Sequence, residues 1–159
     1  MSDTIIRVRR DVPLVLPVSF ERQETRYQGA HHTGPDAFDV RELEQCFHPA
    51  QCEGGTVMGH AVYAYLVRHD LIQRCPSLHD LKAILEKGEI FFQKYFLGKP
   101  ILAWQTRALD DRRYPRIPGL VEERGKGGAL AIKWRHLNQH IGHDTPVWLL
   151  PAHCVKMAL

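Results

Sequence analysis

Residues 128–143 decide the fold of this chain, because their sequence, GALAIKWRHLNQHIGH, satisfies two periodicities. In a helix, one apolar stripe would contain Leu130, Trp134, Leu137 and Ile141. In a strand, one apolar face would contain Leu130, Ile132 and Trp134. The glycines on both sides of the segment favour a strand over residues 129–135. We predict that this strand pairs with residues 146–155 across a loop, as a terminal hairpin.

The segments before it show strand and loop patterns. Residues 110–128, DDRRYPRIPGLVEERGKGG, are rich in charge, proline and glycine, which predicts a loop. Apolar residues alternate along residues 101–109, which predicts a strand.

Three helices are predicted in the middle of the chain. The first begins near Thr56, and apolar side chains surround it, so we expect it to be central and buried. The second begins at Ser77, where Asp80 completes a capping-box pattern, and Gly88 ends it. The third lies at residues 89–97, whose aromatic spacing is ambiguous but fits a short helix better than an alternating strand.

The N-terminal third has extended segments followed by one helical pattern. Residues 4–9 favour a strand, and residues 13–20 are either an edge strand or an irregular arm, because Pro13 and Pro17 remove ladder donors. Residues 36–47 suit a helix. The order predicts an α+β fold, in which a helical middle segment packs on a mainly antiparallel sheet of N-terminal and C-terminal strands.

Length and composition indicate a single globular domain spanning residues 1–159. Hydrophobic residues make up 44% and charged residues 25% of the chain, which are ordinary values. No apolar run reaches the roughly 18 residues of a membrane span, and the N-terminus lacks a secretory signal pattern. We therefore expect a soluble cytoplasmic protein with no membrane partner, whose four cysteines are reduced.

The basic residues are concentrated in the last third of the chain. Residues 101–159 hold nine basic and five acidic side chains, although the whole chain has a net charge of only +3. Arginine and lysine neutralise phosphates, and aromatic side chains stack on unpaired bases. The candidate binding residues within 107–135 are Arg112, Arg113, Tyr114, Arg116, Arg124, Lys126, Lys133 and Arg135.

Histidine is the second unusual feature, with ten in the chain. On a helix, His136, His140 and His143 would share one face, and Asp144 follows them, so zinc or another divalent metal is a candidate cofactor. If the segment is a strand and a loop, that spacing loses its meaning. The candidate catalytic residues are His136, His140, His31 and His32.

The motifs of common enzymes are absent from the sequence. It contains no Walker A motif, no dinucleotide-binding glycine pattern, no G-x-S-x-G elbow and no H-E-x-x-H. The leading hypothesis is therefore a binding protein that uses residues 107–135 to hold nucleic acid or an acidic protein. The alternative is a histidine-based hydrolase or nuclease, with or without a metal. A third hypothesis is a subunit of a larger assembly, with the aromatic residues around 91–104 at an interface.

Overall fold

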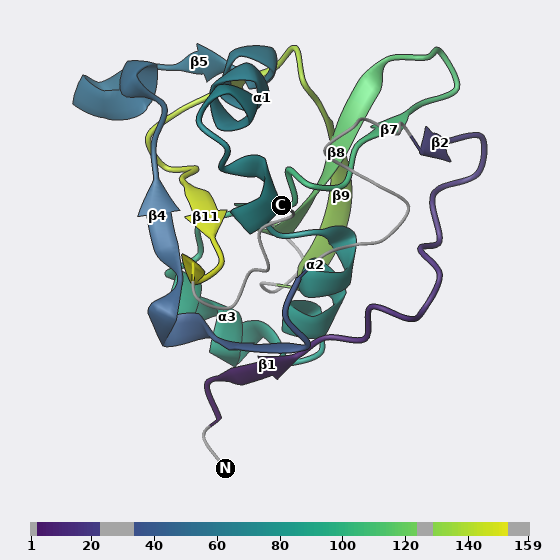
Figure 1. Cartoon of the computed structure of the whole chain (residues 1–159), viewed down its shortest axis with the longest axis vertical. Helices are drawn as coiled ribbons and strands as arrows, with labels where there is room; N and C mark the ends of the chain where they lie inside the picture. Colours follow the sequence, from purple (N-terminus) through teal and green to yellow (C-terminus); the bar gives the residue numbers. More distant parts are fainter. Residues whose placement is uncertain (1–2, 23–33, 124–128, 153–159) are drawn as a thin grey trace.

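A five-stranded antiparallel sheet is the largest sheet in the described part of the computed structural model, residues 3–22, 34–123 and 129–152 (Figure 1). Its strands are β2 (Glu21–Arg22), β6 (Ile101–Leu102), β7 (Ala108–Leu109), β8 (Pro115–Glu122) and β9 (Leu130–His136). β9 pairs with β8 along its whole length, whereas β7 and β6 share the opposite edge of β8. The long β8 therefore organises the sheet.

Three two-stranded ladders connect distant parts of the chain. They are β1 (Ile5–Arg7) with β3 (Ala37–Asp39), β4 (Glu44–Cys46) with β11 (Val147–Leu149), and β5 (Val57–Met58) with β10 (His140–Ile141). All of them are antiparallel. The predicted α+β class, with a helical middle segment and sheets of N-terminal and C-terminal strands, is confirmed.

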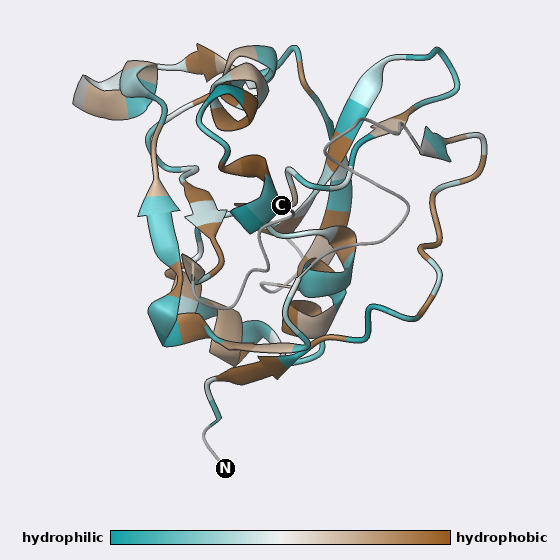
Figure 2. Ribbon diagram, viewed as in Figure 1, coloured by the Kyte–Doolittle hydropathy of each residue, from teal (hydrophilic) through white to brown (hydrophobic). Residues whose placement is uncertain are grey.

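The helices are short, and two of them are amphipathic. They are α1 (Gly59–Arg68), α2 (Leu78–Leu85), α3 (Glu89–Phe96) and the 3₁₀ turns η1 (Val40–Glu42), η2 (Pro49–Gly54) and η3 (Ile72–Arg74). α1 and α2 each have a hydrophobic and a hydrophilic face (Figure 2). α2 lies against β8 and β9. The capping box predicted at its start is confirmed, because the Ser77 N–H donates to Asp80 Oδ2 at 2.8 Å.

Alternation along β8 directs side chains into two hydrophobic clusters. Leu120 belongs to the first cluster, with Phe92 and Phe96 of α3. Ile117 belongs to the second cluster, with Leu66 of α1. All five side chains are buried, and each contributes about 1.5–3 kcal/mol on folding. The sheet thus has a core on each face.

Residues 36–47 do not form the predicted helix. They form β3, η1 and β4, and Phe38 in β3 pairs with Ile6 in β1. Asp39 then caps η1 by accepting the Arg41 N–H. Burial of Phe38 and the ladder with a strand about thirty residues earlier override a local helical pattern.

The prediction of a loop over residues 110–128 is wrong for residues 115–122, which form β8, whereas residues 110–114 form a turn. Pro118 is tolerated because the N and O of a strand residue point to the same side. The Pro118 carbonyl accepts the Ala103 N–H at 2.9 Å, so the Pro118 nitrogen points to the same side. β6 has already ended there, at Leu102, so no strand residue needs an N–H donor from Pro118. Glycine at position 119 leaves room for Leu102, because a Cβ there would lie 2.6 Å from Leu102 Cδ2.

The strand predicted for residues 129–135 is confirmed as β9, but its predicted partner is wrong. β9 pairs with β8, and β11 near the C-terminus pairs with β4 instead. The strand predicted over 101–109 is reduced to β6 and β7, with Trp104 buried between them.

α1 begins at Gly59 rather than near Thr56, and it is not buried on all sides. Its buried residues are Gly59, Val62 and Leu66. The first turn docks on the connection between β9 and β10, where the Gly59 N–H donates to Gln139 O at 3.0 Å. A Cβ at Gly59 would lie 2.7 Å from the Leu137 carbonyl oxygen, so this docking needs glycine.

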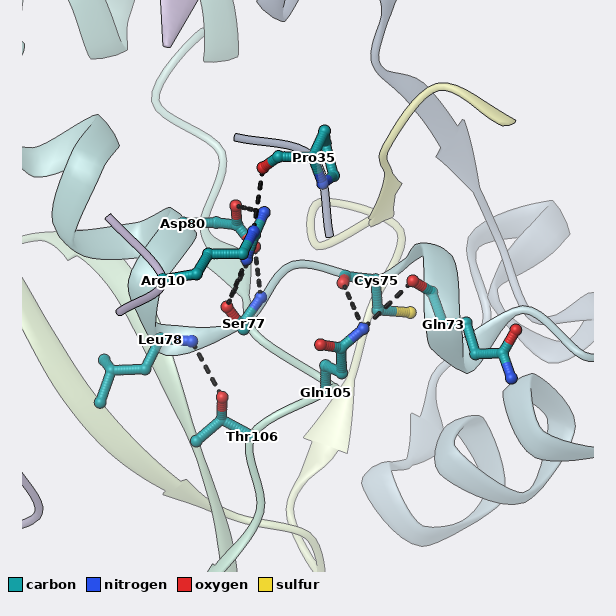
Figure 3. Close-up of polar contacts among 9 residues, drawn as sticks. All are labelled: Arg10, Pro35, Gln73, Cys75, Ser77, Leu78, Asp80, Gln105 and Thr106. Carbon is teal, nitrogen blue, oxygen red and sulfur yellow. Dashed lines mark hydrogen bonds and ion pairs between the residues drawn. The ribbon is translucent and has the colours of Figure 1, made fainter. Parts of the chain in front are cut away.

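A buried polar network fixes the N-terminal arm, residues 8–20, to the start of α2 (Figure 3). Arg10 Nη2 lies 2.8 Å from Asp80 Oδ1, and these side chains are 9% and 1% exposed. Arg10 also donates to the Pro35 carbonyl, and Ser77 Oγ donates to Asp80 Oδ2. The arm contains no strand, so of the two predictions for residues 13–20 the irregular arm is confirmed. The contacts of Arg10 with Asp80 and with the Pro35 carbonyl set its position.

Candidate binding surface

The turn between β7 and β8 presents three exposed residues of the predicted binding set. Asp110 organises this turn: its Oδ1 accepts the N–H groups of Arg112 and Tyr114, both at 2.9 Å. Aspartate favours such turns because its side chain accepts from the backbone two residues onward. The backbone between them reaches φ +64° at Arg113. This turn carries Arg112, Arg113 and Tyr114, which we call the turn surface.

These three residues are exposed. The side chain of Arg113 is 72% exposed and Tyr114 is 52% exposed. The turn is hydrophilic along its length, in contrast to the interior of β8 (Figure 2). Two guanidinium groups and one phenol ring are thus available on a turn of fixed shape.

Arg116 has a different role, although the sequence grouped it with the others. Its Nε donates to Asp110 Oδ2 at 2.8 Å, its Nη1 to the Trp134 carbonyl at 3.2 Å, and its Nη2 lies 2.6 Å from His136 Nε2. Three of its five N–H groups are therefore held inside the protein. Arg116 therefore ties the turn to β9 through these contacts.

His136 lies directly beside Arg116. A guanidinium group has donors only, so His136 Nε2 is on the acceptor side of this contact. Tyr114 contacts the same ring edge-on, with centroids 5.8 Å apart. His136 supports the turn surface from behind.

The Asp110 carboxylate is stable in its charged form. Burial raises its pKa, but hydrogen bonds from the Tyr114 N–H, the Arg116 guanidinium and the Arg112 N–H outweigh burial, so the pKa lies below its usual value. The turn therefore keeps its anchor at neutral pH.

The β8–β9 register places the remaining cations elsewhere. Arg116 and His136 face each other across the ladder, whereas Arg135 pairs with Ile117 and Lys133 with Gly119. Because adjacent strand residues point to opposite faces, Lys133 and Arg135 lie on the other face of the sheet. The predicted basic residues thus divide between two surfaces.

Two of those cations also have partners within the chain. Lys133 Nζ lies 3.4 Å from Glu123 Oε1, and Arg135 Nε donates to Gln139 Oε1 at 3.3 Å. Acidic groups limit the turn surface as well, since Arg113 lies 3.4 Å from Glu21. Arg124 and Lys126 lie outside the described residues.

The predicted metal ligands are spread over several elements. His136 ends β9, and His140 lies in β10, where its Nδ1 is 3.4 Å from Thr56 Oγ1. His143 and Asp144 are exposed in the turn that follows. Over residues 3–22, 34–123 and 129–152, no three His, Cys, Asp or Glu side chains gather as a metal site requires. The candidates His31 and His32 lie outside the described residues.

Sequence reasoning missed the role of Asp110. The sequence patterns assigned no role to Asp110, whereas the aspartate builds the turn. The signal was present, because an aspartate at the first position of a short polar segment favours a side-chain-capped turn.

Comparison with known proteins gives no relatives for this chain: no family model, curated protein or solved structure matches it. Among the described helices, none is long and apolar enough to cross a membrane.

Proposed function

We propose that this protein binds single-stranded nucleic acid through the turn surface, Arg112, Arg113 and Tyr114. The observation that carries the proposal is the fixed turn at Asp110, which holds two exposed guanidinium groups beside an exposed aromatic ring. Guanidinium groups bind phosphates, and an aromatic ring can stack on an unpaired base. Their combination favours nucleic acid over an acidic protein, which offers carboxylates but no bases.

The expected affinity is modest. Only two cations lie on the turn surface, and Glu21 competes for one of them. For single strands, each neutralised phosphate contributes about 0.7 to the slope of log K against log salt. Two phosphate contacts therefore predict a slope of about −1.4.

The test is fluorescence anisotropy with labelled oligothymidylate, between about 50 and 200 mM salt. Arg112→Ala/Arg113→Ala should weaken binding and remove most of the salt dependence. Tyr114→Ala should weaken binding about tenfold, because stacking on one base contributes about 1–3 kcal/mol, while Tyr114→Phe should bind normally.

The matched control removes two exposed cations from other elements. Arg68→Ala/Lys94→Ala removes one exposed cation from α1 and one from α3. It lowers the net charge by as much as Arg112→Ala/Arg113→Ala does, and it should leave binding unchanged. Equal losses of affinity in both double variants would mean that only net charge matters. That result would overturn the proposal that binding occurs at the turn surface. Binding of polyglutamate but not oligothymidylate, lost in Arg112→Ala/Arg113→Ala, would assign the surface to an acidic protein instead.

A further inference from the structure

A groove on another part of the molecule lies between residues 7–13 and α2. It has a volume of about 480 Å³, within the range of small-molecule sites. We propose that it binds a small organic anion, a carboxylate or phosphate ester with an apolar body. The site is independent of the turn surface, which shares no residue with it.

The walls of the groove are fixed before any ligand binds. On one side, the Val8 N–H donates to Asp36 O at 2.8 Å, and Arg10 is held by Asp80 and Pro35 (Figure 3). The two walls are also joined to each other, because His79 Nε2 of α2 donates to the Val12 carbonyl of the arm at 2.7 Å. A preformed site avoids the entropic cost of ordering the arm on binding.

The charges that line the groove favour an anion. Arg7, Arg9 and Lys82 line it, while the acidic residue in its lining is Glu86. Arg7 and Arg9 are two residues apart in an extended segment and so project from the same side of it. Lys82 comes from α2, so cations approach the groove from both walls.

The remaining lining is apolar. Val12 is 45% exposed and Ala83 is partly buried, and both border the groove. An ordinary inorganic anion would leave this surface in water. A ligand that places its anionic head near Arg9 and Lys82 and its body over Val12 and Ala83 would cover it, which is a favourable contribution.

The test uses anilinonaphthalene sulfonate, a dye with an anionic head and an aromatic body whose fluorescence rises on binding. Arg9→Ala/Lys82→Ala should weaken dye binding about tenfold or more, since both charge-assisted contacts are lost. Ala83→Phe fills the apolar half without changing charge and should also block binding. Arg68→Ala/Lys94→Ala is the control of equal net charge, and near-ultraviolet circular dichroism verifies that each variant is folded.

Competition separates the two halves of the proposed ligand. Octanoate should displace the dye at lower concentration than acetate, because only octanoate has an apolar body. Equal displacement by both anions, or unchanged dye binding in Arg9→Ala/Lys82→Ala and Ala83→Phe, would overturn the proposal. Retention of dye binding by Arg112→Ala/Arg113→Ala is expected, so failure at one surface leaves the other test intact.

Discussion

Replacing Asp80 by asparagine should be one of the most destabilising conservative substitutions in this chain. The Asp80 carboxylate accepts every hydrogen bond that it makes here: from Arg10 Nη2 at Oδ1, and from Arg10 Nη1, the Ser77 N–H and Ser77 Oγ at Oδ2. An asparagine must direct its NH₂ group at one of these donors, whichever way the amide is turned. It also leaves Arg10, only 9% exposed, without its counter-ion.

The magnitude follows from that environment. Breaking a buried ion pair by removing one partner costs about 3–5 kcal/mol, because the remaining charge stays buried. With a urea m-value of about 2 kcal/mol/M, a loss of about 4 kcal/mol lowers the unfolding midpoint by about 2 M. Circular dichroism and tryptophan fluorescence during urea unfolding measure this shift.

A double-mutant cycle isolates the pair. Arg10→Met and the double variant Arg10→Met/Asp80→Asn complete it, and we expect the double variant to lose less than the sum of the single losses. Glu21→Gln is the matched control, because the Glu21–Arg113 pair is exposed and should contribute less than about 1 kcal/mol. A loss below about 1 kcal/mol in Asp80→Asn would refute the burial argument.

Three further predictions concern other parts of the fold. Gly59→Ala should destabilise the protein by about 1–3 kcal/mol in urea, because the new Cβ meets the Leu137 carbonyl; an unchanged midpoint would mean that α1 docks less closely. The folded-state pKa of Asp110 is lowered, so its contribution to stability is present above its unfolded pKa of about 3.9 and is lost as pH falls from there through the folded-state pKa. Asp110→Asn should therefore make the free energy of unfolding depend less steeply on pH below about 3.9. An unchanged pH profile in this variant would contradict the lowered pKa. Burial raises the pKa of Cys75, so dithionitrobenzoate should react with exposed Cys52 in the native protein and with Cys75 only after unfolding; equally fast reaction of Cys75 would show that its thiol is accessible.

The local part of the fold could be predicted from the sequence. The capping box at Ser77 and Asp80 involves residues three apart, and α3 follows directly after Gly88. Such features depend on the backbone of one segment and on side chains within one turn of it. The capping box at Ser77 and the helix after Gly88 could therefore be predicted from local sequence, and the structure confirms both.

The strand pairings could not be predicted in the same way. Residues 115–122 contain Pro115, Pro118 and Gly119, which usually indicate a loop. They are acceptable in β8 only because β6 ends beside Pro118 and because Leu102 fills the space above Gly119. Those conditions are set by another strand, so no local pattern contains them.

The candidate binding surface illustrates the same distinction for function. A charge count treats every arginine in residues 107–135 as equally available, but the β8–β9 register separates them. The guanidinium N–H groups of Arg116 contact Asp110, Trp134 and His136. Arg135 lies on the opposite face of the sheet. The desolvation and hydrogen bonding of Arg116 make it part of the scaffold, and removing it should distort the turn rather than delete one phosphate contact. The register and the turn therefore decide which cations share a surface, and among the described residues Arg112 and Arg113 share the turn.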